Sequence, residues 1–259
     1  MKVSIITVCF NSQDTIKETI ESVISQTYKN IEYIVIDGKS DHGTCSVINP
    51  FNTFISKFVS EKDNGIYDAL NKGIRMSTGD VVGFLHADDV FDNKTVIEKV
   101  VKSFDVNIDI LYGDINYVNR NNLNKIVRKW KSSTYSKNKF KWGWMPPHTS
   151  FFLKRTSYLK YGSYNLNLGT SADYELMLRM FEVHQLSSVY LPSNITKMRM
   201  GGVSNSSFIN RLKANKNDKK SWIINSLKPY WFTFLLKPGA MSCIFFFTNV
   251  RHIIFRKFY

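Results

Sequence analysis

Apolar positions recur with two different periods through the first half of this chain. Runs of β-branched and aromatic residues predict four strands, at Val3 to Cys9, Tyr33 to Ile36, Phe54 to Val59 and Val81 to Leu85. Between them, apolar residues recur at helical spacing from Ile16 to Ile24, after a polar N-cap at Asn11 or Ser12, and from about Ile66 to Met76. This alternation predicts an α/β fold in which the strands run parallel.

Each predicted strand ends in a polar or acidic loop, and the last loop holds the adjacent acids Asp88 and Asp89. Because parallel strands present their carboxyl ends at one edge of a sheet, the loops are expected to meet where open α/β sheets bind ligands. Two neighbouring carboxylates favour a cation between them, which indicates a metal-bridged diphosphate. The pattern alone leaves open that these acids only cap the helix expected after Asn93.

The composition indicates the kind of partner and the compartment of the protein. The 259 residues include 35 Lys and Arg against 21 Asp and Glu, a formal charge of +14 that favours an anionic partner such as nucleic acid, a lipid surface or a phosphorylated substrate. After Glu182 the only acid is Asp218, so the positive charge is concentrated toward the C-terminus. Three widely spaced cysteines and an N-terminal apolar run too short for a signal peptide predict a cytoplasmic protein.

Several short motifs, in this order, resemble glycosyltransferase family 2, whose enzymes have the GT-A fold, a mixed sheet flanked by helices. The likeness covers about the first 205 residues. It is carried by Val3 to Val8, Ser25 to Tyr28, Glu32 to Gly38, Asn71 to Gly73, Gly79-Asp80, the Asp pair, Ser171 to Leu176, Arg179 and Gly201 to Ser204.

The resemblance implies a nucleotide-sugar donor, with Asp37 as the acid that pairs with an N–H of a uracil-type base. A turn residue beside Gly38 is the alternative for Asp37. Asp88 matches the last acid of the D-x-D motif, and the resemblance implies that Asp88 and Asp89 are both metal residues, with Asp88 holding Mn²⁺ or Mg²⁺ and Asp89 supporting that site. His86 stands where the family usually has Asp or Asn and is either a ligand or a spacer. The other implied nucleotide contacts are Thr7, Phe10, Asn11, Asp63, Lys72 and Ala87.

On the acceptor side, Asp173 matches the residue that deprotonates the attacking sugar hydroxyl, so that one in-line displacement inverts the anomeric centre. A helix-terminal acid stabilised by the helix dipole is the alternative. The aromatic stretch before His148 predicts that Trp142, Trp144 and His148 contact the acceptor or the diphosphate, although both tryptophans could equally be buried in the core. Arg199 is expected to close over the donor phosphates.

The sequence therefore predicts a nucleotide-binding half, residues 1–105, an acceptor half, residues 106–205, and a helical basic and aromatic region, residues 206–259. The longest stretch without charge in residues 206–259, Pro238 to Val250, is too short to span a bilayer. This favours either an anchor on an anionic membrane surface or a helix packed on the domain.

The predicted activity is an inverting, metal-dependent transfer from a nucleotide sugar, most simply a UDP-sugar, to a saccharide hydroxyl. The expected acceptor is a polyprenyl-diphosphate-linked oligosaccharide used for O-antigen, capsule or exopolysaccharide at the inner face of the plasma membrane. One alternative is a sugar-nucleotide pyrophosphorylase, although no Gly- and Arg-rich loop follows the first strand. The other is a non-catalytic membrane- or RNA-binding protein, although no nucleic-acid module appears and no nucleic-acid partner is expected.

Overall fold

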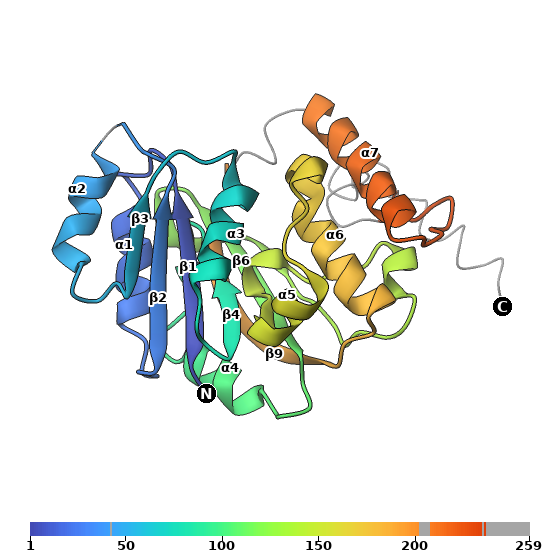
Figure 1. Cartoon of the computed structure of the whole chain (residues 1–259), viewed down its shortest axis with the longest axis horizontal. Helices are drawn as coiled ribbons and strands as arrows, with labels where there is room; N and C mark the ends of the chain where they lie inside the picture. Colours follow the sequence, from blue (N-terminus) through green and yellow to red (C-terminus); the bar gives the residue numbers. More distant parts are fainter. Residues whose placement is uncertain (42, 202–207, 235, 237–259) are drawn as a thin grey trace.

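A single nine-stranded mixed sheet with helices on both faces forms the body of the protein (Figure 1). The computed structural model describes residues 1–41, 43–201, 208–234 and 236; for residues 208–214 it describes the helical backbone alone. The strand order is β3-β2-β1-β4-β8-β6-β9-β5, and β7 pairs with β6. The predicted α/β class is confirmed.

The first four strands form a parallel layer, as predicted. They are β1 (Val3–Cys9), β2 (Ile31–Asp37), β3 (Lys57–Ser60) and β4 (Val81–Phe84). The third strand begins later than predicted, because residues 52–55 form hydrogen-bonded turns after the 3₁₀ turn η1 (Asn49–Phe51). These turns leave the apolar side chain of Phe54 59% exposed instead of in the sheet.

Strands from the second half extend the same sheet. β8 (Phe152–Lys154) runs antiparallel to β4 and joins it to β6 (Ile110–Asn119). β6 pairs in parallel with β9 (Ser188–Arg199) and forms a hairpin with β7 (Asn122–Trp130), while the short β5 (Val90–Phe91) pairs with β9. The sheet therefore continues from the predicted nucleotide-binding half into the predicted acceptor half.

The two faces of the sheet bury separate apolar clusters. One face is covered by α1 (Ile16–Ile24), α2 (Thr44–Ile48) and α4 (Val96–Ser103). The other is covered by α3 (Ile66–Met76), α5 (Arg155–Tyr161) and α6 (Ala172–Leu178), with the π-turn η5 (Arg179–Val183) continuing α6. The helix α3 has the predicted bounds. The N-cap of α1 is Thr15, because residues 12–15 form a separate turn ahead of the helix.

A buried carboxylate ties the amino ends of the first strands together. Glu32 on β2 accepts hydrogen bonds from Ser4 Oγ at 2.6 Å and from the backbone N–H of Thr78 at 2.7 Å, and Lys57 Nζ lies 3.1 Å away. Burial raises the pKa of Glu32, but these hydrogen bonds outweigh burial and lower the pKa to about 2. Glu32 is therefore held in its charged form.

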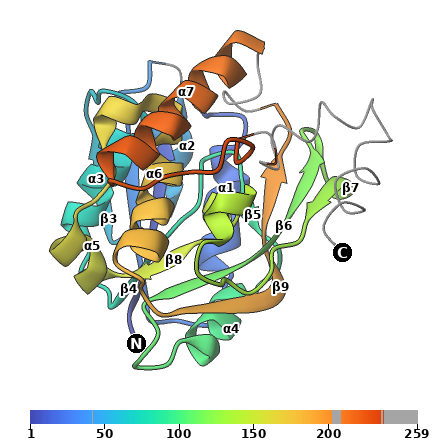
Figure 2. The ribbon, with the colours of Figure 1, turned by 90° about the vertical axis from the view of Figure 1, so that its right-hand side faces the viewer.

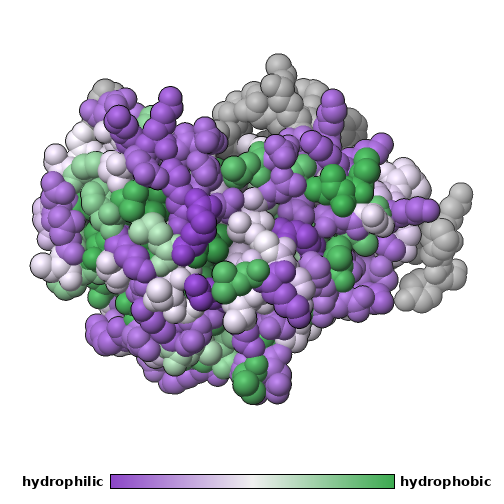
Figure 3. Space-filling model, viewed as in Figure 1, coloured by the Kyte–Doolittle hydropathy of each residue, from purple (hydrophilic) through white to green (hydrophobic). Residues whose placement is uncertain are grey.

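The helix after β9 packs on the domain. α7 (Phe208–Ile224) lies along α6 (Figures 1 and 2), with Trp222 fully buried and donating from Nε1 to the hydroxyl of Tyr174 at 2.8 Å. For this helix, packing on the domain is the alternative that holds. The membrane-surface anchor was predicted for residues 206–259, and residues 237–259 of that region lie outside the described residues. Among the helices that the structure describes, none has the length and apolar content needed to cross a membrane. The face seen in Figure 3 is mainly hydrophilic, with apolar surface in separate patches.

Candidate active site

The carboxyl ends of β1 to β4 form the donor edge, at the top of the sheet in Figure 1. The strand register places Cys9, Asp37 and Ser60 side by side at this edge. Asp37 is fully buried, and its carboxylate accepts hydrogen bonds from Ser60 Oγ at 2.6 Å, from the backbone N–H of Ser40 at 3.0 Å and from the Ser40 hydroxyl. Burial raises the pKa of Asp37, but these hydrogen bonds lower it below its ordinary value. Asp37 is thus a charged group satisfied by its own chain.

This arrangement corrects the expectation that Asp37 touches the base, because the residue exposes no surface. Asp63, from the loop after β3, is better placed. A Cβ added to Gly38 would lie 2.7 Å from Asp63 Oδ2 and 3.4 Å from the ring of Phe10, so the three residues adjoin. Asp63 is half-buried and Phe10 is 60% exposed, which leaves both accessible to a ligand.

Other residues expected at the donor edge support its loops. Asn11, in a left-handed conformation, receives the N–H of Asp41 on its side-chain oxygen at 3.0 Å. Lys72 on α3 holds the loop after β3, donating to the carbonyl of Lys62 at 2.9 Å and pairing with Glu61 at 3.0 Å. Thr7 lies fully buried inside the sheet, where its hydroxyl accepts from Tyr33, so the expected direct contact between Thr7 and a nucleotide is wrong.

The acidic loop, residues 86–89, follows β4 and turns through a hydrogen bond from the N–H of Asp89 to the carbonyl of His86. Asp88 is partly exposed and Ala87 is buried. Asp89 points inward, is 1% exposed, and accepts from the backbone N–H of Arg199 at 3.1 Å. Burial and the charge of Asp88 raise the pKa of Asp89 well above its ordinary range. The two acids therefore face different surroundings, and Asp89 is a support of the loop, not the metal ligand that was predicted.

Arg199 holds the acidic loop in place through hydrogen bonds from its side chain and its backbone. Its guanidinium donates to the backbone carbonyl of Asp88 at 2.6 Å and to that of Arg120 at 3.0 Å, and it forms an ion pair with Glu18 on α1. Each of its three nitrogens donates to one of these partners, and its side chain is buried. The expectation that Arg199 closes over donor phosphates is therefore wrong for this arrangement.

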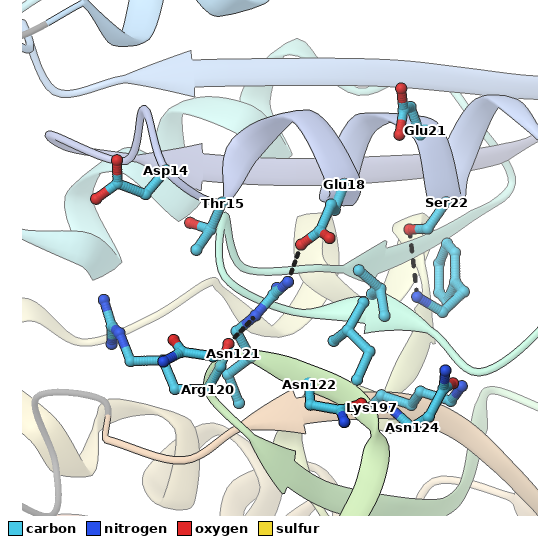
Figure 4. Close-up of a pocket in the computed structure, with 14 residues that line it drawn as sticks. Asp14, Thr15, Glu18, Glu21, Ser22, Arg120, Asn121, Asn122, Asn124 and Lys197 are labelled. Carbon is cyan, nitrogen blue, oxygen red and sulfur yellow. Dashed lines mark hydrogen bonds and ion pairs between the residues drawn. The ribbon is translucent and has the colours of Figure 1, made fainter.

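Arg199 also lines a polar pocket of about 870 Å³ between α1 and the β6–β7 hairpin (Figure 4). In this view Glu18 on α1 points toward the hairpin that carries Asn121 and Asn122, and a dashed line marks its ion pair; Asp14, from the turn before α1, and Glu21 also line the pocket. Of the residues predicted for the active site, this pocket contains Arg199 alone. The pocket is thus separate from the donor edge.

The catalytic candidates come together from three segments. His148 begins the 3₁₀ turn η3 (His148–Ser150), and its Nδ1 lies 3.6 Å from Oδ2 of Asp173, the second residue of α6. The ring of His86 lies 5.6 Å from the ring of His148. Burial, reinforced by His148 and opposed by the charges of Asp88 and Asp173, lowers the pKa of His86 to about 4. His86 is therefore neutral at neutral pH.

Sequence analysis did not select Tyr67, which approaches Asp173 from α3. Burial, together with the charge of Asp173, raises the pKa of Tyr67 well above its ordinary value, so the phenol keeps its proton. Its hydroxyl lies 3.4 Å from the carbonyl of Thr170 in the 3₁₀ turn η4 (Leu166–Ser171). The sequence contained one indication that Tyr67 lies at the site, namely its position at the start of α3, directly after a loop of the donor edge.

The two tryptophans ahead of His148 have different roles. Trp144 packs against Tyr112, Tyr135, Phe140 and Phe181, at ring distances of 5.4 to 5.8 Å. It belongs to the core margin, so its predicted contact with acceptor or diphosphate is wrong. Trp142, at the end of the 3₁₀ turn η2 (Lys139–Trp142), is 59% exposed and available to a partner.

A divalent cation fits at Asp88 if the substrate completes its ligands. The described residues contain no group of three or more His, Cys, Asp or Glu placed to hold a metal by themselves. Mg²⁺ and Mn²⁺ at phosphate sites commonly use one or two carboxylates together with phosphate oxygens and water. Asp88 offers such a carboxylate, and the buried Nδ1 of His86 has no hydrogen-bond partner in the described part of the chain.

Comparisons with known proteins find glycosyltransferases among the relatives of this chain. An uncharacterized glycosyltransferase of Mycobacterium tuberculosis is 33% identical over 181 residues, 68% of each chain. The Escherichia coli UDP-Glc:alpha-D-GlcNAc-diphosphoundecaprenol beta-1,3-glucosyltransferase WfaP is 40% identical over 90 residues, 34% of this chain and 35% of WfaP.

Solved structures share the fold at low identity. The Staphylococcus aureus protein TarS, in complex with UDP-GlcNAc, superposes with a TM-score of 0.70 at 15% identity over 95% of this chain and 73% of that one. The mannosyltransferase PcManGT of Pyrobaculum calidifontis, in complex with GDP-Man and Mn²⁺, gives 0.62 at 17% identity over 92% and 69%. The expected GT-A fold is confirmed. Residues 4–162 match the description Glycosyl transferase family 2, and the chain belongs to that family of glycosyltransferases.

Proposed function

We propose that this protein transfers a sugar from a UDP-sugar, with inversion at the anomeric carbon, to a hydroxyl of a saccharide acceptor. The observation that carries the proposal is the meeting of an accessible carboxylate on the acidic loop, Asp88, with the His148–Asp173 pair from the opposite half of the sheet. Transfer needs these two functions, a group that holds the donor diphosphate and a base that activates the acceptor.

The donor base is proposed to lie against Phe10 and Gly38, with Asp63 accepting from the N–H of uracil. Any side chain at position 38 would clash with the carboxylate of Asp63, so the glycine keeps that carboxylate accessible. Asp37 holds the loop that carries Gly38 through its bonds to Ser40. WfaP is a UDP-Glc-dependent glucosyltransferase and TarS has been solved with UDP-GlcNAc, which supports a uridine donor here.

The cation is proposed to be Mn²⁺ or Mg²⁺, held by Asp88 with His86 beside it. When bound, such an ion neutralises charge on the departing diphosphate. The neutral state of His86 suits it to lie near a cation, because an imidazolium there would repel it.

Asp173 is proposed as the general base. Its carboxylate takes the proton of the acceptor hydroxyl while the acceptor oxygen bonds to the anomeric carbon and the bond from that carbon to the diphosphate breaks, releasing UDP. His148, 3.6 Å away, orients Asp173, and the protonated Tyr67 faces it from α3. Attack opposite the leaving group inverts the anomeric centre.

The acceptor is proposed to be a polyprenyl-diphosphate-linked oligosaccharide, as in the assembly of O-antigen, capsule or exopolysaccharide at the inner face of the plasma membrane. The acceptor of WfaP is alpha-D-GlcNAc-diphosphoundecaprenol, which supports this class. Residues 1–105 are proposed to bind the nucleotide and residues 106–205 the acceptor, with the site at their junction.

Calorimetric titration of UDP, with Mn²⁺ and then with EDTA, tests the donor site. The wild type is expected to bind UDP with Mn²⁺ and to lose at least about tenfold in affinity with EDTA, and Asp88→Ala is expected to reproduce that loss. Asp173→Asn should keep UDP affinity but lose transfer by at least about a hundredfold, the range for a general base. Asp105→Asn, at an exposed acid elsewhere, is the matched control. Wild-type transfer by the Asp173→Asn variant would disprove the assignment.

A further inference from the structure

Four aromatic side chains form an aromatic surface, comprising the exposed Trp142, Tyr230 and Trp231 and the half-buried Phe232 between them. Trp231 is 86% exposed and Trp142 is 59% exposed. The ring of Trp142 lies 5.6 Å from that of Tyr230 and 5.4 Å from that of Phe232, and the ring of Trp231 lies 5.5 Å from that of Phe232. The rings thus form one contiguous group from segments almost ninety residues apart.

The backbone holds these rings outward. Phe140 is fully buried in the same 3₁₀ turn that exposes Trp142. The chain after α7 returns along this turn, and the buried Thr233 donates from Oγ1 to the carbonyl of Lys141 at 2.6 Å. Figure 2 looks onto this side, with the red-orange segment after α7 passing close to the yellow-green turn. A cluster of exposed large apolar rings held in this way indicates an interaction site.

The charge around the aromatic surface indicates the kind of partner. The two segments that build it, residues 131–148 and 219–236, contain seven lysines and no acidic residue. The Nζ of Lys141 lies 5.5 Å from the centre of the Tyr230 ring, and Lys228 is exposed. Tryptophan and tyrosine place an apolar body and a polar edge at the headgroup level of a bilayer, and lysines add attraction to anionic lipids.

The aromatic surface also adjoins the acceptor side of the active site. Trp142 is six residues before His148, and the intervening Pro146 and Pro147 are buried. Phe140, beneath Trp142, lies 5.9 Å from the ring of Tyr174, the residue after Asp173. Trp142 is therefore close in the chain to His148, and the turn that carries Trp142 contacts the start of α6, which carries Asp173.

We propose that the aromatic surface docks into the headgroup interface of an anionic bilayer, so that the catalytic pair faces acceptors carried in that membrane. The statement about acceptors rests on the proposed function, whereas docking does not. The four rings supply apolar contact, and the lysines supply electrostatic attraction that weakens as salt rises.

Sedimentation with vesicles of phosphatidylglycerol and phosphatidylcholine in equal parts tests docking on the full chain. Trp231→Ser is expected to lower the partition coefficient at least about tenfold, the effect of exposing one large side chain. Lys228→Ser is expected to lower it about fivefold. Phe54→Ser removes an aromatic ring with the same exposure as Trp142, outside the aromatic surface, and is expected to leave partitioning unchanged. All three variants should bind UDP as the wild type does, which shows that they are folded.

Equal sedimentation of Trp231→Ser and wild type would overturn the proposal, as would an equal loss in Phe54→Ser. Protection of Trp231 from acrylamide quenching without vesicles would also overturn it, because the rings would then be covered by other parts of the chain. If Trp231→Ser loses vesicle binding while Asp173→Asn retains transfer, docking stands and the proposed function fails. The two conclusions are thus tested separately.

Discussion

Replacing Arg199 by methionine is expected to destabilise the protein and to weaken metal-dependent UDP binding. Methionine keeps most of the apolar volume but removes every donor of the guanidinium. The backbone carbonyls of Asp88 and Arg120 then lose their donors, at 2.6 and 3.0 Å, and Glu18 loses its ion-pair partner. The hydrogen bond from the Arg199 backbone to Asp89 is retained, so the variant isolates the side chain.

The expected magnitude follows from burial. A hydrogen bond to a charged group contributes about 1.5–3 kcal/mol, so loss of two part-buried ones costs about 3–6 kcal/mol. Glu18→Gln leaves the bonds of Arg199 to both backbone carbonyls in place. At this end, where the Glu18 side chain is 50% exposed, the amide oxygen and solvent accept from the guanidinium instead of the carboxylate, so the variant is expected to cost less than about 1 kcal/mol. The two ends of one ion pair should therefore differ several-fold in their effect on the free energy of unfolding.

Urea denaturation of the wild type, the two single variants and the double variant measures these free energies. Because Glu18→Gln removes a partner that Arg199→Met has already lost, the double variant should be destabilised by little more than Arg199→Met alone. Arg75→Met, at an exposed arginine on α3, is the control and should change stability by less than about 0.5 kcal/mol. Calorimetry should show weaker UDP binding with Mn²⁺ in Arg199→Met and near wild-type binding in Glu18→Gln.

Similar small losses in Arg199→Met and in Arg75→Met would refute the reasoning, because the buried carbonyls would then have found other donors. An equally large loss in Glu18→Gln would refute the statement that solvent compensates the exposed end. Wild-type UDP affinity in a destabilised Arg199→Met variant would show that the acidic loop keeps its shape without the guanidinium.

Three further predictions follow from named contacts. Because the pKa of Glu32 is lower in the folded chain than its ordinary 4.5, its contribution to the free energy of unfolding is complete above pH 4.5 and is lost as the pH falls toward 2. Urea denaturation at a series of pH values should therefore show a loss of about 3 kcal/mol on the acid side. The Glu32→Gln variant should lack this loss, and the control Glu98→Gln, at an acid whose side chain is 37% exposed, should retain it. Gly83→Ala places a Cβ 2.3 Å from the ring of Phe152 and should cost about 1–3 kcal/mol in thermal unfolding, with recovery in the Gly83→Ala/Phe152→Leu variant; no recovery would mean that the backbone, not the ring, is the obstacle. Asp63→Asn should weaken UDP binding at least about tenfold in calorimetry, and an unchanged affinity would assign the base contact to another residue.

The periodicity of the chain was sufficient for the layered part of the fold. β1 and α3 have their predicted bounds, because a mainly apolar strand that is buried along its whole length and a helix that is apolar on one side each have a single way to bury their side chains. The start of β3 was misplaced because Phe54 reads as a strand residue, while the turns after η1 expose it. A local turn therefore prevailed over apolar character.

Sequence alone determined the α/β class, the gathering of polar loops at the donor edge, and, through the order of its motifs, the family. It could not separate Asp88 from Asp89, because adjacent acids are distinguished only by which one meets the N–H of Arg199, more than a hundred residues away. Three other features of the site also depend on contacts between segments distant in the chain. They are the hydrogen bond from Ser60 to Asp37, the packing of Trp144 on Phe181 and the approach of His148 to Asp173. Side-chain direction and hydrogen-bond satisfaction depend on neighbours that only the folded chain brings into contact, so the tertiary structure decided which predicted residues lie at the site and which support it.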